Sequence, residues 1–275
     1  MSVSYKNPWL RLPLALSLLC IPAFAQTLSF PNFSSTSGLT LKGSATTTTT
    51  SDGVVIRLTT TKCCSAGSAF TTAAVPFVIP ADTFSTFFQF RITNPGGIDP
   101  ADGIVFALRD SPQSLGGTGG SQGYVGIGNS VAVKLDTYQN EGEINNNHVS
   151  ILTNGQVTEA DAQTPYGVSN CHQPVNVTGC MANGHLWSVW IDFDGASIHV
   201  ALADNSTTRP ADLIDAPLSI PLLLTAGNAW VGFTAGTGGG YENHDIVDWQ
   251  YYNTFNPTPV GNPQVLPTSL ISQVR

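Results

Sequence analysis

Apolar and polar residues alternate in short runs along most of this chain. Residues 84–92 give the clearest run, with Phe84, Phe88, Phe90 and Ile92 on one face and Ser85, Gln89 and Arg91 on the other. The same period recurs at 104–108, 131–135, 187–193 and 198–202. Because successive side chains of a strand point to opposite faces, this period predicts strands that each bury one face.

Residues that favour turns separate these runs. Asp194-Gly195 stands between the last two of them and predicts a two-residue hairpin turn. Val54 to Thr60 alternates as a further strand, and Thr46 to Thr50 is either an exposed strand or a loose loop. No run combines a helical period with capping residues. Many short strands punctuated by Gly, Pro and Asn predict an all-β fold in which two sheets pack face to face.

The composition agrees with this fold and excludes some partners. Charged residues make up 10% of the 275 residues, whereas Thr, Ser, Asn and Gly are abundant, which favours strands over helices. The formal net charge is −8. No basic patch is expected that could displace counterions from phosphates, which argues against nucleic acid or an anionic membrane as a partner.

Residues 1–25 are expected to be a signal peptide. Lys6 and Arg11 precede the short apolar core Leu12 to Ile21, and Ala23-Phe24-Ala25 matches a cleavage motif that would leave Gln26 as the mature N-terminus. The alternative, a membrane anchor, needs a longer apolar stretch, and no later segment is long and apolar enough to span a membrane. We therefore expect a secreted or periplasmic protein, of bacterial origin.

The remaining chain divides into one domain and a tail. Residues 26–253 carry the strand pattern, and single all-β sandwiches commonly reach this length. Residues 254–275 are rich in Pro and lack a pattern, so we expect a disordered or loosely docked tail.

The cysteines indicate disulfides. Removal of the signal peptide takes Cys20 away and leaves an even number, Cys63, Cys64, Cys171 and Cys180. An even count in an exported protein favours pairing. Cys171 pairs most simply with Cys180, whereas the adjacent Cys63 and Cys64 bridge each other, stay free or bond elsewhere. Their spacing fits no common zinc pattern.

The expected strand 131–135 runs into a loop crowded with metal-ligand side chains. Asp136, Asn140, Glu143 and His148 fall within thirteen residues, and Tyr138 can add a backbone carbonyl. Hard cations such as calcium prefer oxygen clusters of this kind. Because the loop begins where a rigid strand ends, the pattern favours a fixed site.

Several segments, in the same order along the chain, resemble the legume-type (L-type) lectins, and bacterial relatives look closest. The matching segments are Ala101-Asp102-Gly103, Gly119 to Gly126, Asp136-Thr-Tyr-x-Asn140 followed by His148, Trp187 to Gly195, Gly232 to Gly238, and His244 to Trp249. Together they span about Leu28 to Asn253. The resemblance implies a concanavalin-like jelly-roll β-sandwich of two antiparallel sheets that binds carbohydrate without catalysis.

The resemblance also implies a calcium site. Asp136 and Asn140 would ligate calcium with side-chain oxygens, Tyr138 with its backbone carbonyl, and Glu143 with a second carboxylate, for which Asn145 is the alternative. The plain alternatives are a turn-capping Asp136 and a turn Asn140 in the left-handed conformation.

A transition metal is not expected beside the calcium. His148 corresponds to the family's ligand for that metal, and the alternative is a buried structural histidine. At the position of Lys134 the family usually has an acid. An ammonium group cannot ligate a cation, but it can lie near Asp136 and replace the charge of the missing metal. We therefore expect calcium and no manganese.

Asp102 is the strongest candidate for contact with sugar, because a carboxylate accepts charge-assisted hydrogen bonds from paired hydroxyl groups. The resemblance implies a cis peptide before Asp102, held through ordered water by the calcium cluster; the alternative is a turn aspartate. It further implies an amide donor at Asn140, a backbone N–H donor at Gly123, and a specificity loop that includes Gly236 and Thr237. Tyr138 is either an aromatic face for a sugar ring or a packing residue.

Two other functions compete with a lectin. The same architecture hosts glycoside hydrolases, which need two carboxylates about 5–9.5 Å apart. Asp192 and Asp194 are the nearest pair, but they lead into a turn, and no Glu-x-Asp-x-x-Glu motif is present. We expect no enzyme. A structural or adhesive module with a degenerate sugar site is the other alternative, favoured by Lys134 and the short metal loop. The identity of the sugar and any homo-oligomer cannot be read from the sequence.

Overall fold

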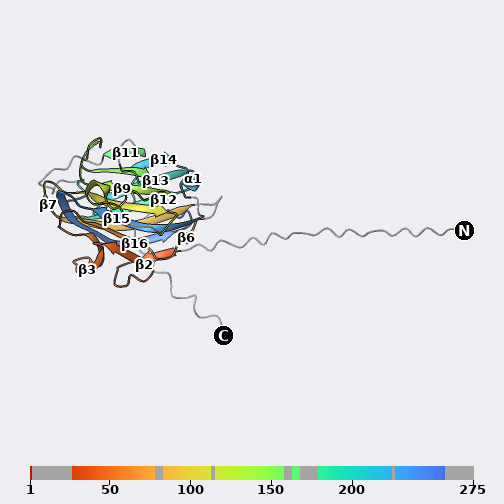
Figure 1. The fold of residues 1–275 in the computed structure, drawn as a ribbon, viewed down its shortest axis with the longest axis horizontal. Coiled ribbons are helices and arrows are strands. Elements are labelled where there is room, and N and C mark those ends of the chain that lie inside the picture. Colours follow the sequence, from red (N-terminus) through yellow and green to blue (C-terminus); the bar gives the residue numbers. More distant parts are fainter. Residues whose placement is uncertain are drawn as a thin grey trace, which may run out of the picture.

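Two antiparallel sheets, stacked face to face, form the body of the protein (Figure 1). The computed structural model describes residues 27–77, 83–112, 115–157, 163–167, 179–224 and 227–257, together with Met1. Within these residues each sheet has eight strands, and helix is limited to one short α-helix and one 3-10 turn. The structure confirms the predicted all-β sandwich.

Sheet A, as we call the first sheet, contains β1 (Thr27–Phe30), β3 (Thr46–Thr50), β4 (Gly53–Thr59), β7 (Phe84–Gly97), β12 (Leu186–Phe193), β13 (Ser197–Asp204), β14 (Ile214–Pro217) and β16 (Gly240–Tyr252). The strand order is β14-β13-β12-β7-β16-β4-β3, and β1 pairs with β16. The threonine run forms the last strand of this order, β3, which confirms the exposed-strand alternative.

Sheet B contains β2 (Leu39–Gly43), β5 (Ala66–Thr71), β6 (Val75–Pro76), β8 (Gly103–Arg109), β9 (Ser130–Asp136), β10 (His148–Thr153), β11 (Gln163–Gly167) and β15 (Asn228–Gly236). The strand order is β11-β10-β9-β8-β15-β5-β2, and β6 pairs with β15. The 3-10 turn η1 (Gly119–Ser121) and the helix α1 (Ile220–Leu223) lie in connections.

The apolar face that the sequence predicts in β7 lies in the core between the sheets. The fully buried residues of this face are Phe84, Phe88, Phe90 and Ile92. The Phe88 ring packs edge-on against Phe233 of sheet B, with 4.9 Å between ring centroids. Phe106 of β8 packs against both rings, at 6.0 and 5.6 Å. Burial of each such side chain contributes about 1.5–3 kcal/mol, so this aromatic layer holds the two sheets together.

The centre of sheet B is buried on both faces. Val105, Ala107 and Ala132 lie on the outer face of β8 and β9 and pack with Tyr124 and Ile127 of the following loop in a second apolar cluster. The loop that contains η1 therefore lies over this face of the sheet. Its position brings the glycine-rich segment to the beginning of β8.

The hairpin between β12 and β13 turns one residue later than predicted. Asp194 N donates to Ser197 O at 3.2 Å, so Gly195 and Ala196 form the two-residue tip. Asp194 Oδ1 accepts the N–H groups of Ala196 and Ser197, both at 2.8 Å. Asp194 therefore lies just before the two-residue tip, where its side chain caps the N–H groups of the turn.

The expected tail begins in contact with sheet A. Phe255 N donates to Thr83 Oγ1 at 2.9 Å, and Asn256 N donates to Ser85 Oγ at 2.8 Å. Residues 2–26 and 258–275, with nearly all of the expected signal peptide and the rest of the tail, lie outside the described residues. In the described part of the chain, neither helix has the length and apolar character needed to cross a bilayer.

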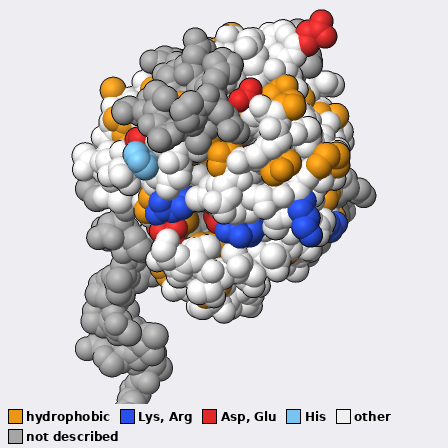
Figure 2. All heavy atoms as spheres, turned by 90° about the vertical axis from the view of Figure 1, so that its left-hand side faces the viewer, with side chains coloured by type: hydrophobic (Ala, Val, Ile, Leu, Met, Phe, Trp, Pro, Cys, Tyr) orange, Lys and Arg blue, Asp and Glu red, His pale blue; other side chains and the backbone are white. Residues whose placement is uncertain are grey.

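Acidic partners neutralise several basic side chains. Arg91 pairs with Asp52 and Arg57 pairs with Asp245, each at 2.7 Å. Figure 2 shows basic side chains in a row on one end of the molecule, with acidic side chains beside some of them. The positive charge of that end is therefore partly compensated.

The disulfides are described only in part. Cys63 and Cys64, in the loop between β4 and β5, are joined to each other and exposed. This vicinal bridge is one of the three fates that the sequence allows. Cys180 is also disulfide-bonded, but Cys171, its expected partner, lies outside the described residues.

At one end of its strands, which we call the binding edge, sheet B brings together residues that are far apart in the sequence. The strand register places five of them opposite one another on adjacent strands, in the order Ala66, Gly236, Gly103, Asp136 and His148. Asp102 directly precedes Gly103 of this row, and Asn140 and Glu143 lie in the loop that joins Asp136 to His148. The sandwich thus gathers at one edge what the sequence distributes over separate motifs.

Candidate functional site

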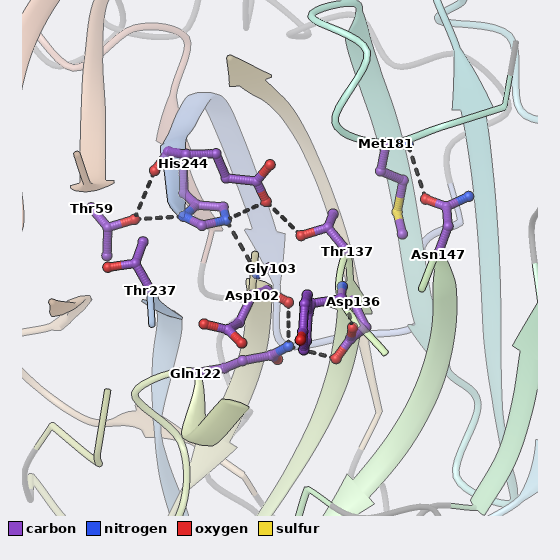
Figure 3. Close-up of polar contacts among 12 residues, drawn as sticks. Thr59, Asp102, Gly103, Gln122, Asp136, Thr137, Asn147, Met181, Thr237 and His244 are labelled. Atoms are coloured by element: carbon purple, nitrogen blue, oxygen red, sulfur yellow. Dashed lines mark hydrogen bonds and ion pairs between the residues drawn. The ribbon is translucent and has the colours of Figure 1, made fainter. Parts of the chain in front are cut away.

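The peptide between Ala101 and Asp102 is cis, as predicted. Asp102 N donates to Gly236 O at 3.0 Å, and Thr137 N donates to Asp102 O at 3.2 Å. Gln122 Nε2 donates to the same Asp102 oxygen at 2.5 Å, and Figure 3 shows this side chain between Asp102 and Asp136. The main chain of Asp102 is therefore fixed by three other segments.

The Asp102 carboxyl group is buried and has an acceptor to spare. The residue is 4% exposed, and its Oδ2 has no hydrogen-bond partner among the described residues. A Cβ added at Gly238 would lie 3.5 Å from that oxygen, so glycine leaves this side of the carboxyl group open. Burial raises the pKa of Asp102 to about 7, and the charges of Glu242 and Glu143 add to the effect. Such an oxygen favours a hydroxyl donor from outside the protein.

Asn140 lies beside the glycine-rich loop. A Cβ added at Gly120 would come within 2.7 Å of Asn140 Oδ1, so a larger residue would displace the amide. Asn140 Nδ2 is buried and has no partner among the described residues. A hollow of about 310 Å³ opens here, with Thr118, Gly120 and Glu143 also in its lining. Asn140 therefore lines a hollow between its own loop and the loop that contains η1.

The backbone donor predicted at Gly123 is used inside the loop. Gly123 N donates to Gly117 O at 2.9 Å, because the loop folds back on itself after η1. Gly120 lies against Asn140 instead, and its N–H makes no hydrogen bond within the described parts of the chain. Gly120 therefore fits the donor position better than Gly123, and the adjacent glycines 119 and 120 are the sequence signal for it.

Gly236 and Thr237, predicted to contact sugar, support the site from behind. A Cβ at Gly236 would lie 2.7 Å from Gly119 O. The Thr237 hydroxyl donates to Lys62 O at 2.7 Å and accepts from Ser65 N at 3.1 Å, and the residue is fully buried. Thr237 O accepts from Gly119 N at 2.9 Å. Since these groups are occupied by the neighbouring loops, they position the site and do not face a ligand.

The residues predicted to bind metal do lie together. One ligand atom each from Asp136, Glu143 and His148 lies within 4.8 Å of the other two. Tyr138 N donates to Asp136 Oδ1 at 2.8 Å, and Asn140 N donates to Glu143 Oε2 at 2.5 Å. Tyr138 is half-buried beside this cluster, and its aromatic face toward a sugar stays a prediction.

Lys134 occupies the centre of the acidic cluster. Its ammonium nitrogen lies 2.7 Å from Glu143 Oε1 and 3.3 Å from Asp136 Oδ2. The side chains of all three residues are almost completely buried. It also donates to Val157 O at 3.2 Å. Burial raises the pKa of Asp136 well above its ordinary value, and the charge of Lys134 opposes that effect. The predicted contact between Lys134 and Asp136 is therefore present.

His148 and Asn145 are bonded to each other in the loop. His148 Nδ1 lies 2.9 Å from Asn145 O. Burial lowers the pKa of His148 to about 4, and the charge of Lys134 lowers it further. The ring is therefore neutral at neutral pH.

A divalent cation does not fit this donor set. The four carboxylate oxygens of Asp136 and Glu143 already accept from Tyr138 N, Gln122 Nε2, Lys134 Nζ and Asn140 N. An ammonium group in contact with both carboxylates repels a second cation at short range. Calcium binding would require Lys134 to leave.

A buried network that sequence reasoning missed lies behind the site (Figure 3). His244 Nε2 lies 3.2 Å from Gly103 N and 3.0 Å from Glu242 Oε1. Thr137 Oγ1 donates to Glu242 Oε1, and Thr59 Oγ1 contacts His244 Nδ1, both at 2.5 Å. The network holds Gly103 and Thr137, which directly follow Asp102 and Asp136. The motif around His244 marks the strand and the segment Gly119 to Gly126 contains Gln122, but no local pattern indicates the contacts of Glu242 or of the Gln122 side chain.

Comparisons with known proteins agree with the family that the motifs resemble. A family model described as the legume lectin domain matches residues 25–267. A lectin-like protein of Arabidopsis thaliana is 28% identical over 212 residues, which cover 69% of this chain and 76% of that protein. The L-type lectin-domain containing receptor kinase VIII.1 of the same plant is 29% identical over 181 residues, 63% of this chain and 24% of the kinase.

Solved lectin structures share the fold. Basic winged bean lectin with Tn-antigen has a TM-score of 0.68 and 24% identity over 83% of this chain and 98% of that chain. Winged bean acidic lectin complexed with methyl-α-D-galactose has a TM-score of 0.68 and 23% identity over 83% and 98%. These structures confirm the predicted jelly-roll sandwich.

The relatives named above come from a plant, so the closer likeness to bacterial proteins stays a prediction. The domain match over most of the chain and the shared lectin fold indicate that the function is carbohydrate binding. The chain belongs to the legume lectin family.

Proposed function

We propose that Asp102, Asn140 and the Gly119–Gly120 backbone form the site at which this lectin binds neutral sugars. One observation carries the proposal: Asp102 Oδ2 and Asn140 Nδ2 are buried polar atoms without a partner in the described structure, and they adjoin two glycine loops that are packed against each other. Asp102 Oδ2 lies beside Gly238, Asn140 lies beside Gly120, and a Cβ added at Gly238 would lie 3.2 Å from Gly119 Cα. Buried polar groups are normally paired. A sugar hydroxyl pairs both, because it donates to the carboxylate and accepts from the amide.

Both carboxylates that the hydrolase alternative would use are engaged in other contacts. Asp192 forms an ion pair with Arg209, and Asp194 Oδ1 accepts two backbone N–H groups at the hairpin tip. Neither carboxylate is at the edge that holds Asp102. These two described carboxylates therefore do not form an acid and nucleophile pair.

A glycan-array screen of the mature protein tests the proposal, followed by titration calorimetry with the best ligand. Asp102→Ala and Asn140→Ala should each abolish measurable binding while the unfolding midpoint stays near that of the wild type. Sugar retention by Asp102→Ala equal to the wild type would refute the assignment. An array without any bound glycan would favour the structural or adhesive module.

Asp248 provides a matched control. It is another buried aspartate, with its pKa also raised to about 7 by burial, but it lies in sheet A and accepts from Gln89 N at 3.0 Å. Asp248→Ala should leave sugar affinity unchanged. An equal loss in both variants would show that general destabilisation, and not the site, explains the effect.

We expect modest affinity for a single sugar. A shallow polar site of this kind gives dissociation constants from micromolar to millimolar, about −4 to −8 kcal/mol. Useful avidity would then require a multivalent glycan or a homo-oligomer. Light scattering of the mature protein, with and without ligand, measures the oligomeric state.

Export from the cell is part of the proposal. The disulfide between Cys63 and Cys64 and the disulfide-bonded state of Cys180 support an oxidising compartment. N-terminal sequencing of protein from the periplasm or the medium should begin at Gln26. A retained Met1 would argue against a cleaved signal peptide.

Calcium, which the sequence predicts as a cofactor, would use Asp136, Tyr138, Asn140 and Glu143. In the structure these residues are bonded to one another and, through Glu143 and Asp136, to Lys134. The proposed sugar contacts come from side chains and backbone of the protein itself, so sugar binding is proposed without a metal contact.

A further inference from the structure

Lys134 supplies the positive charge that a buried carboxylate cluster needs. Asp136 and Glu143 carry two negative charges in a nearly water-free site, and the Lys134 ammonium lies between them at 3.3 and 2.7 Å. Two carboxylates and one ammonium leave a net charge of −1. With an acid at this position, as the family usually has, the same site would carry three negative charges and would need metal ions to offset them.

The register of β9 fixes Lys134 in this place. Lys134 pairs with Val105 of β8 and with Ser150 of β10, at the centre of sheet B. Because residues two apart on a strand share a face, its side chain points the same way as that of Asp136. The ammonium group therefore reaches the end of the strand from inside the sheet and needs no loop movement.

Gln122 makes the link from this cluster to the sugar site. Its Nε2 donates to Asp136 Oδ2 at 2.6 Å and to Asp102 O at 2.5 Å. Because both neighbours are acceptors, the amide nitrogen must face them. The resemblance to lectins implies that calcium and ordered water make this connection in the family. In this protein one side chain spans it.

The main chain of Gln122 is itself held in position. Gln122 is fully buried and ends η1 with φ of 48°. Its N–H donates to Gly119 O at 2.8 Å, and its carbonyl accepts from Thr234 Oγ1 at 2.8 Å. The main chain that carries the linking amide is thus anchored to the glycine loop and to β15.

We propose that this lectin organises its sugar site without a metal ion, with the Lys134 ammonium in place of the cation charge and the Gln122 amide in place of the metal-held link to Asp102. The inference rests on the proposed sugar site. Lys134 and Gln122 act as positioning residues, since neither is argued to touch the sugar.

Metal removal tests the inference directly. Protein dialysed against chelator should keep its sugar affinity, and elemental analysis should find no stoichiometric calcium or manganese before dialysis. Neither CaCl2 nor MnCl2 should raise the unfolding midpoint, whereas a bound ion would stabilise the fold with the logarithm of the ratio of its concentration to its dissociation constant. A loss of affinity on chelation that calcium restores, or a calcium-dependent rise in the midpoint, would overturn the inference. The elemental analysis and the unfolding midpoints decide whether the protein binds a metal ion even if no glycan is found.

Lys134→Glu supplies the reciprocal test. This change restores the acid at that position and removes the competing charge, so the variant should become less stable in chelator and should gain stability from manganese or calcium. If metal ions leave the stability of the variant unchanged, as expected for the wild type, that result would count against the role given to Lys134. If the variant does not fold, the wild-type measurements still decide.

Gln122→Met isolates the link to Asp102. It removes the amide donor and keeps the length of the side chain, so sugar affinity should fall about tenfold or more, as expected for loss of a hydrogen bond to a charged group. Gln89→Met is the matched control, since Gln89 is also buried and donates to Ser188 Oγ at 3.0 Å in sheet A. Equal affinities of the two variants would overturn the assignment of Gln122, whatever their midpoints.

Discussion

Replacing Asp102 with asparagine should stabilise the fold above neutral pH while it abolishes sugar binding. The substitution keeps the shape of the side chain and removes its charge. In the wild type the carboxyl group is 4% exposed and its Oδ2 has no partner in the described structure. The ionised form is therefore destabilised by burial, and the site retains it because sugar recognition needs the charge.

The size of the effect follows from the pKa of Asp102, which burial raises from 3.8 to about 7. One pKa unit corresponds to about 1.4 kcal/mol, so ionisation of the buried group costs the fold up to about 4 kcal/mol. The asparagine amide still leaves a buried polar group, which costs about 1–3 kcal/mol. The net gain of Asp102→Asn above neutral pH should therefore be about 1–3 kcal/mol.

The sign of the pH dependence is fixed by the direction of the shift. Because the folded-state pKa lies above the unfolded value, stability from the neutral carboxyl group is fully present below pH 3.8 and is lost as the pH rises through about 7. Denaturant unfolding of both proteins should show a gap that widens between these two pH values. Asp248→Asn should show a similar gap but keep sugar binding. A gap for Asp102→Asn that is constant with pH would refute the reasoning.

Three further predictions concern the core, a close backbone contact and the pH dependence of binding. Phe106→Ala should lower the free energy of unfolding by about 3–5 kcal/mol in denaturant titration, since Phe106 is fully buried against Phe88 and Phe233; a cost below about 1 kcal/mol would contradict the aromatic layer. Gly232→Ala should lower the free energy of unfolding by about 1–3 kcal/mol or more, because the added Cβ would lie 2.1 Å from Ala69 O. Gly128→Ala is the control and should leave the free energy of unfolding unchanged in the same assay, because nothing lies within 4 Å of its added Cβ. Sugar affinity measured by calorimetry should fall as the pH drops below about 7, by about tenfold per unit once Asp102 is protonated; affinity that is flat down to the ordinary pKa of 3.8 would argue against a charged acceptor.

The strands and the row of site residues could be predicted because they depend on local patterns. The alternation in β7 and β8 decides which side chains enter the core, and the matched motifs placed Asp102, Asp136 and Asn140 at strand ends. These residues then meet because antiparallel neighbours share an edge.

The contacts that complete the site could not be predicted, because each depends on how distant loops close. Gly123 and Gly120 look alike in the sequence, and only the fold of the loop shows that Gly123 N is bonded to Gly117 O. Thr237 turns away from the ligand side because Lys62 and Ser65, in a loop far back in the chain, take its hydroxyl. Gln122 lies inside the matched segment Gly119 to Gly126, but its role follows from two distant acceptors, Asp102 O just before β8 and Asp136 Oδ2 at the end of β9.

The charged residues of β9 also protect the architecture of sheet B. Val133 and Leu135 face the core between the sheets, and Lys134 and Asp136 alternate with them on the other face. A slip of β9 by one residue against β8 would exchange the two sets and place an ammonium and a carboxylate among phenylalanine rings. No neighbouring register is therefore tolerable for this strand. The residues that shape the recognition site thus also specify the register of β9. A chain that has folded into the sandwich with this register has therefore also assembled its binding site.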